Sequence, residues 1–392
     1  MAGLPDPDLP LRDCAEHILD SSLGRKALQC DSAPGLAVFL RDLVAAMHRL
    51  THSCHLPEFT DHGLFHVCSI VDRMSIWSCA PSNGRVTGLV DCIDPAEAAV
   101  LLAAALTHDI GMLSQRPEDL PPDASAWEAK GQTDVPAWVR QTHVDRIEGL
   151  LKRVVGQTDC GQLLENPLLF RAIAVAKAHQ SWPWEPGFAD LGDRDRGLAA
   201  VLAVSDLLDE NASRCDTSTL LRHRQGTMLN FGHWIRHGLT AGRVLVDEGV
   251  VNVTLVRPPG TDNQLLPVYQ ALRNHFRLTG LYATSLSILG GVTLNMSFAP
   301  ETGCPVAENP SLSGWSDIRG LPTQDVMAFH VLCSFLPLAL QDSTRVTNDN
   351  LQRVCELGLE SIDLSCFHRA WGAVENRSSW EMAVAAIDAG AI

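Results

Sequence analysis

The 392-residue sequence lacks any apolar run long enough to cross a bilayer. It also lacks the features of a secretory signal, because its first residues, MAGLPDPDLPLRD, are acidic and rich in proline. Internal repeats and the G-x-x-x-x-G-K-[ST] phosphate-binding loop are absent as well. We therefore expect a cytoplasmic protein that does not insert into a membrane and is not a P-loop nucleotidase.

Positive charge is scarce. The sequence has 30 Lys and Arg against 46 Asp and Glu, which gives a formal net charge of −16. General nucleic-acid binding is disfavoured, because phosphate backbones are bound by clustered Lys and Arg. A small phosphorylated ligand held by a metal ion and a few arginines remains compatible with this charge.

Paired cysteine motifs are also missing. The sequence contains 12 cysteines but no C-x-x-C, so we interpret them as mostly buried thiols in a reducing compartment. With 46% hydrophobic and 19% charged residues, the chain can bury a large core. Its length suits one large domain or two.

The first part of the sequence has the apolar spacing of helices. One of them is predicted to begin at Asp94, a residue that caps helices, with Pro95 at the first helical position and Glu97 three residues after the cap. A proline-rich segment, 116–134, is predicted to be a loop of the kind that covers a site. The predicted helices lie within 11–53 and at 64–77, 94–108, 135–155, 166–179 and 197–211.

Near residue 245 the pattern changes. The segment RVLVDEGVVNVTLV, 243–256, alternates as a strand does, and 281–289 and 292–300 also resemble strands. A helix is predicted at 265–278, and the tail is predicted to be helical from about 323. We expect a mostly α protein, with a helical domain over 1–244 and a smaller α+β section over 245–392 that could contact a protein partner.

Histidines and aspartates recur on apolar helices or near helix ends, where an unpaired polar side chain is costly. Any one of them could be a hydrogen-bonded core residue, and only the set as a whole indicates a metal site. Their nitrogen and oxygen atoms suit Mn, Fe, Co, Ni or Zn better than Ca. The set consists of His66, His108, Asp109, His143, His179 and Asp206.

The order of this set resembles that of HD-domain metal-dependent phosphohydrolases. The segments FTDHGLFH, LTHDIGM and LAVSDLLDENASR are most similar to the HD-CE branch. The resemblance rests on residues 58–215 and extends through FGHWIRHG and the following strands to about residue 256.

This resemblance implies an HD-domain helical bundle that binds divalent transition metal ions, two in number. Asp109 would bridge them, and a hydroxide between the ions would attack a phosphoester, most simply that of a nucleotide. The first ion would bind His66, His108, Asp109 and Asp206, and the second Asp109, His143 and His179.

Other polar residues near this set are candidates for catalysis. His62 precedes His66 by four residues and could contact the substrate or orient a ligand. Arg146 follows His143 by three residues and could bind a phosphate, as could Arg214, although an ordinary ion pair is the alternative for both. Asp209 could support the Asp206 region. We therefore assign catalytic roles to Asp109, His62 and Arg146.

Two departures argue against cyclic dinucleotide hydrolysis of the HD-GYP type. Gln180 replaces the second of two adjacent histidines in AHQSWPWEPGF, which also lacks Gly-Tyr-Pro, and Met112 replaces the lysine usual after HDIG.

Two alternatives remain open. Mixed-valence di-iron oxygenases of small polyols or phosphonates share the ligand order on the same scaffold. A non-catalytic nucleotide-binding module that signals through residues 245–392 is the other, although intact ligands weigh against it.

Overall fold

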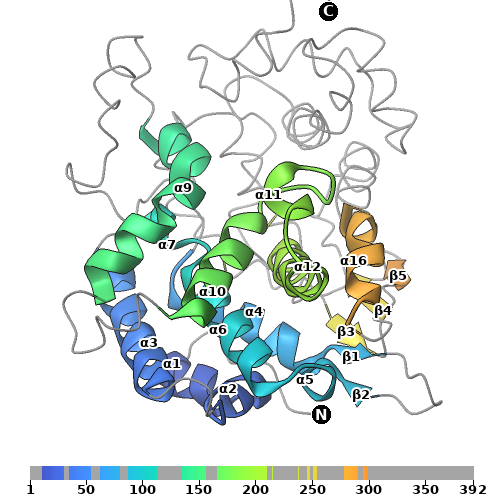
Figure 1. Ribbon diagram of the computed structural model, residues 1–392, viewed down its shortest axis with the longest axis horizontal. Helices are drawn as coiled ribbons and strands as arrows, with labels where there is room; N and C mark the ends of the chain where they lie inside the picture. Colours follow the sequence, from blue (N-terminus) through green and yellow to red (C-terminus); the bar gives the residue numbers. More distant parts are fainter. Residues whose placement is uncertain are drawn as a thin grey trace, which may run out of the picture.

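The computed structural model describes residues 11–30, 35–53, 62–79, 87–113, 135–155, 166–209, 214, 237, 245–247, 250–253, 278–289 and 295–298. This part of the chain is mostly α-helical, which confirms the predicted fold class (Figure 1). The α-helices are α1 (Leu11–Asp20), α2 (Ser22–Ala27), α3 (Leu36–Ser53), α4 (Leu64–Ile76), α5 (Leu89–Cys92), α6 (Pro95–Thr107), α7 (Ile110–Leu113), α9 (Val135–Val155), α10 (Pro167–Ala178), α11 (Pro186–Ala189), α12 (Asp193–Leu207) and α16 (Ala283–Ser287).

Helix α6 begins as the sequence predicts. The Asp94 carboxylate accepts a hydrogen bond from the Glu97 backbone N–H at 2.8 Å, and the Glu97 carboxylate accepts one from the Asp94 N–H at 3.0 Å. This reciprocal cap satisfies donors that have no partner within the helix. Arg194 at the start of α12 binds both Glu97 oxygens at 2.6 Å, so the N-terminal ends of α6 and α12 are joined.

The middle of the bundle is formed by helices that are apolar on every side. In α6, the residues from Glu97 to Thr107 are all buried, and in α12 those from Gly197 to Ser205 are buried. A helix without a polar face must be covered by neighbours. Helix α12 packs against α4, α6, α10 and α16, and Figure 1 shows α10 and α16 on its two sides.

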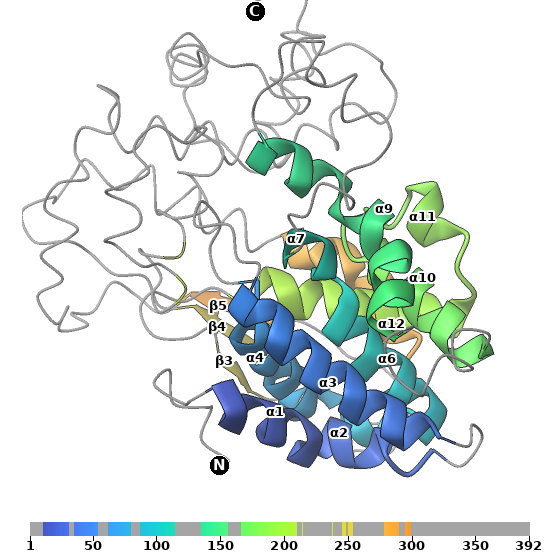
Figure 2. The ribbon, with the colours of Figure 1, turned by 90° about the vertical axis from the view of Figure 1, so that its left-hand side faces the viewer.

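Helices α1, α2 and α3 cover one side of this core (Figure 2). Helix α1 packs on α4, while α2 and α3 pack on α6. Phe39, Leu40 and Leu43 of α3 are almost completely buried, at the spacing of one helical face. Among the described residues, none of the helices combines the length and the apolar character that crossing a membrane requires.

The strands are short. Strands β1 (Ser78–Cys79) and β2 (Thr87–Gly88) form an antiparallel pair. In a second sheet, β4 (Val250–Val253) lies between β3 (Leu245–Asp247), which is antiparallel to it, and β5 (Asn295–Phe298), which is parallel. The prediction of a strand at 292–300 is confirmed, whereas the segment predicted as one strand from 243 contains two.

The prediction of a strand at 281–289 is wrong. This segment forms the end of a 3-10 helix, Leu278–Tyr282, followed by α16. Tyr282, Leu286 and Leu289 are buried, at a spacing of four and three residues that fits a helix rather than the period of two of a strand. The predicted helix 265–278, except its last residue, the loop 116–134 and the segments beyond 298 lie outside the described residues. The boundary proposed between 244 and 245 stays a prediction.

Candidate metal centre

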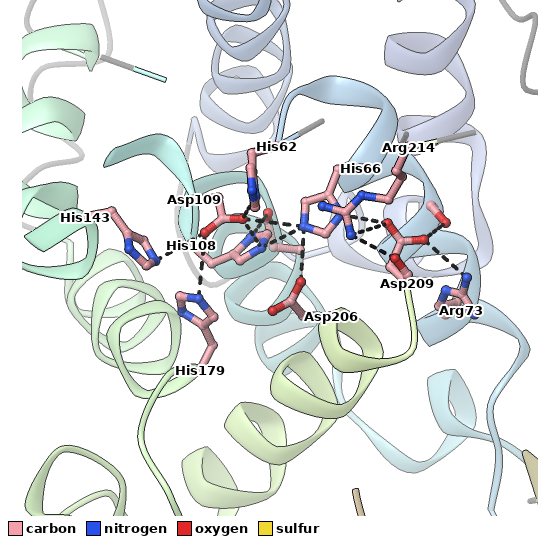
Figure 3. A network of polar contacts seen from close by, with 12 residues as sticks. His62, His66, Arg73, His108, Asp109, His143, His179, Asp206, Asp209 and Arg214 are labelled. Atoms are coloured by element: carbon pink, nitrogen blue, oxygen red, sulfur yellow. Dashed lines mark hydrogen bonds and ion pairs between the residues drawn. The ribbon is translucent and has the colours of Figure 1, made fainter. Parts of the chain in front are cut away.

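The six predicted ligands gather where several helices end (Figure 3). His108 directly follows α6, His179 directly follows α10, and Asp206 lies in the last turn of α12. The C-terminal end of a helix has a partial negative charge. Three such ends that meet at one place favour a cation there.

Asp109 lies at the centre of the cluster, and its two carboxylate oxygens face different histidines. Oδ2 is 3.3 Å from His108 Nε2 and 3.5 Å from His66 Nε2. Oδ1 is 3.3 Å from His143 Nε2 and 3.8 Å from His179 Nε2. The side chain of Asp109 is 7% exposed, so the interaction is shielded from water. A carboxylate in this position can bridge two ions.

The outer nitrogen atoms of three histidines already have partners. Nδ1 of His108 and Nδ1 of His179 each lie within 2.8 Å of the backbone carbonyl three residues earlier, to which they donate. Nδ1 of His66 donates to a carboxylate oxygen of Asp209 at 2.7 Å. These bonds fix the tautomer, so in the neutral rings the inward Nε2 atoms carry lone pairs.

Inward lone pairs require a positive partner. His66 Nε2 and His108 Nε2 are 3.3 Å apart, and His66 Nε2 is 3.2 Å from Asp206. Two acceptors at this separation repel each other unless a proton or a metal ion lies between or beside them. The donors around Asp109 form two groups that could hold a metal ion, one of His66, His108, Asp109 and Asp206 and one of Asp109, His143 and His179.

The neighbouring carboxylates favour the protonated form of two of these histidines. Burial lowers the pKa of His66, but hydrogen bonds to Asp109, Asp206 and Asp209 raise it well above the ordinary value. Burial also opposes charge on His108, and the neighbouring Asp109 carboxylate nevertheless raises the pKa of this imidazole. Burial tends to raise the pKa of Asp109, yet the charge of His108 holds it well below its usual range. Positive charge is thus drawn into the centre even without an ion.

Asp209 supports His66 from behind. It is completely buried, and beside His66 it contacts Arg73 at 3.2 Å, Arg214 at 3.4 Å and the hydroxyl of Ser69. Burial raises the pKa of Asp209, but the charge of Arg214 and the hydrogen bond from His66 hold it well below the usual range. Asp209 is therefore an anion that orients His66, and Arg214 forms an ion pair with it.

Gly111 brings His143 to the cluster. A Cβ atom at this position would lie 2.2 Å from the backbone oxygen of His143, closer than any real contact. The absence of a side chain thus permits α7 to pack directly on α9, which places His143 beside Asp109.

The two other residues predicted to be catalytic, His62 and Arg146, lie in different environments. His62 lies just before α4, with Nδ1 2.8 Å from Asp109 Oδ2, and burial lowers its pKa to about 3. Arg146 is buried on α9, one turn after His143, where burial lowers the pKa of its guanidinium to about 10. Their catalytic roles stay predictions.

Two residues of this network were not predicted from the sequence. Ser69 and Arg73 follow His66 by three and seven residues, which places all three on one face of α4. That spacing is a signal available in the sequence, but their partner Asp209 lies more than 130 residues away along the chain.

The helical bundle and its buried His and Asp cluster define an HD-type protein with a candidate metal centre. The HD-CE family matches residues 56–278, more than half of the chain, and the chain belongs to this family. The comparisons with curated proteins and with solved structures gave no match.

Proposed function

We propose that the protein is a metal-dependent phosphohydrolase that acts on a nucleotide or another phosphoester. One observation carries the proposal: the buried Asp109 presents each of its two oxygens to a separate group of histidines. This arrangement matches a two-ion site with a bridging carboxylate, a type of site common in enzymes that cleave phosphoesters. Membership of the HD-CE family agrees with it.

Divalent ions held here would supply an acidified water and neutralise charge on the phosphoester. The protein contributes orientation and charge. His62 donates a hydrogen bond to Asp109 and, with a pKa of about 3, is neutral near pH 7. Its role would be to hold the bridging carboxylate in place and to accept a hydrogen bond through its second nitrogen.

Arg146 is the candidate for binding the phosphate. With a pKa of about 10 it keeps its positive charge at neutral pH, and a buried guanidinium binds phosphate oxygens in a bidentate manner. The substitution Arg146→Lys keeps the charge but loses this geometry. We expect it to raise KM more than it lowers kcat.

The decisive experiment combines elemental analysis with a screen of nucleotides and generic phosphoesters in added Mn²⁺. We expect about two ions per chain at the centre around Asp109 and release of phosphate or a nucleotide product. Asp109→Asn should lose both ions and lower kcat by about 10³-fold or more, since both groups share this carboxylate. The exposed Asp145 on α9 provides the matched control, because Asp145→Asn should retain metal and activity.

The screen also separates the alternatives. Iron as the resident metal, uptake of O₂ and no phosphoester cleavage would identify an oxygenase instead. If the wild type and Asp109→Asn take up the same amount of Mn²⁺ and Zn²⁺, the centre around Asp109 binds no ion, and both enzymatic proposals are overturned.

A further inference from the structure

A second cluster of metal-ligating side chains lies between α1 and α4, apart from the six residues described above. Donor atoms of His17, Cys68 and Asp72 all lie within 4.8 Å of one another. His17 Nε2 and Asp72 Oδ1 are 2.6 Å apart, and the Cys68 thiol forms a hydrogen bond with that of Cys14. The cluster therefore presents nitrogen, oxygen and sulfur donors at one place.

The spacing of these residues explains their convergence. Cys14 and His17 are three apart on α1, Cys68 and Asp72 are four apart on α4, and the two helices pack together. Residues three or four apart share one face of a helix. His66, Ser69 and Arg73 occupy a different face of α4.

The environment also suits an ion. Cys14 and Cys68 are almost completely buried and Asp72 is 8% exposed, while the His17 side chain is 35% exposed. The site is therefore shielded on the inside and reachable from the surface at His17. A buried carboxylate beside two thiols costs less free energy when a cation is present.

We propose that His17, Cys68 and Asp72 bind a zinc ion; the Cys14 thiol lies outside this group of mutually close donors and is the nearby candidate for a fourth position. Zinc favours four ligands, binds sulfur, imidazole nitrogen and carboxylate oxygen, and is the usual metal of closed structural sites. The hydrogen bond between His17 and Asp72 would be replaced by bonds from both side chains to the ion. The site would clamp α1 to α4, the helix that carries His66.

Cobalt distinguishes this site from the centre at Asp109. The full-length protein is stripped with a chelator and titrated with Co²⁺ alone. Only a site with sulfur ligands gives a thiolate-to-cobalt charge-transfer band in the near ultraviolet, and the centre at Asp109 has only nitrogen and oxygen donors. We expect the band to appear, and added Zn²⁺ to abolish it.

Variants assign the band to these residues. Cys68→Ser should abolish it and reduce the zinc content by one ion per chain, whereas Cys92→Ser, at a partly exposed cysteine of α5, should leave both unchanged. His17→Ala, at a partly exposed position that folding tolerates more easily, should weaken zinc binding at least tenfold, on the order of the loss of one ligand. Asp109→Asn should keep the band.

A missing band, or a band of full strength in both Cys68→Ser and His17→Ala, would overturn the zinc site. Either result leaves the phosphohydrolase proposal untouched, because that proposal is tested by phosphoester cleavage and by Asp109→Asn.

Discussion

Single residues determine the chemistry of the candidate centre through their hydrogen-bonded partners. His66, His108 and His179 all turn Nε2 inward because Nδ1 has an acceptor behind it. For His108 and His179 the acceptor is the backbone carbonyl three residues earlier, in the helix that the histidine follows, and a side-chain substitution cannot remove it. The third is the Asp209 carboxylate, which makes Asp209 the residue through which ligand orientation can be tested separately from the ligands.

Asp209→Asn is expected to lower metal affinity by about 10- to 100-fold without removing any ligand. An amide can still accept the hydrogen bond from His66, but it no longer neutralises Arg73 and Arg214. Loss of a buried partner of this kind costs about 3–5 kcal/mol of unfolding free energy. Titration calorimetry with the metal ion measures the loss of affinity, and urea unfolding measures the loss of stability.

Ser69→Ala provides the graded control, because it removes the hydrogen bond from a hydroxyl to the Asp209 carboxylate and keeps the charges. Its cost should be about 1.5–3 kcal/mol, the range of a hydrogen bond to a charged group, with a smaller loss of metal affinity than in Asp209→Asn. Wild-type metal affinity in folded Asp209→Asn would show that Asp209 serves stability alone.

The contacts of a single residue could be predicted from the sequence where its partners are close along the chain, and could not where they are far away. The six ligands were proposed from the sequence as a set, and the structure brings all six together. The contacts of Asp209 with Ser69 and Arg73 could not be foreseen, because these two residues lie on α4, far away in sequence. The cluster at Cys68 was missed for the same reason, since its two halves come from separate helices.

At the scale of elements, close contact between α7 and α9 brings His143 to the centre. Gly111→Ala is expected to push the two helices apart, because the added methyl group meets the backbone of His143. Overpacking costs about 1–3 kcal/mol, and the group formed by Asp109, His143 and His179 should lose its ion first. Elemental analysis should then find one ion per chain fewer than in the wild type.

Gly149→Ala is the matched control on α9. An added Cβ there has no atom within 4 Å, so the substitution should leave metal content unchanged and stabilise the helix by up to about 1 kcal/mol. If Gly111→Ala keeps two ions, the close approach of α7 to α9 is not needed for the second group.

Elements could be predicted where local signals determine them. The cap at Asp94 and the apolar residues that follow predict α6, and this helix begins at Pro95 in the structure. The segment 281–289 was predicted wrongly because its mixture of leucine, threonine and tyrosine is compatible with both periods. Its packing on α12 selects the helix, and such packing is not visible in the sequence alone.

At the scale of the whole molecule, the centre has charges that compete with a metal ion. In the metal-free protein the pKa values of His66 and His108 are raised, so protons compensate the three carboxylates nearby. A raised pKa contributes stability below the unfolded value of about 6.5, and this contribution is lost as the pH rises through the folded value. A bound ion would replace those protons and restore the stability.

His179 behaves in the opposite way. Burial lowers its pKa to about 4, so it stays neutral in the folded protein while the unfolded chain takes up a proton near pH 6.5. Its contribution is present above about pH 6.5 and is lost as the pH falls toward about 4. At neutral pH His179 is therefore ready to bind an ion without losing a proton.

These two effects predict how stabilisation by metal depends on pH. An ion must displace protons from His66 and His108, so its affinity should increase from pH 6 to pH 8. The rise in melting temperature caused by Mn²⁺ should therefore be larger at pH 8 than at pH 6. An ion present at about 100 times its Kd contributes about 2.7 kcal/mol to the free energy of unfolding.

Asp109→Asn, which lacks the bridging carboxylate, should show no shift in melting temperature at either pH. A shift of equal size at both values would mean that Mn²⁺ displaces no protons from these histidines, and hence that it binds elsewhere on the protein.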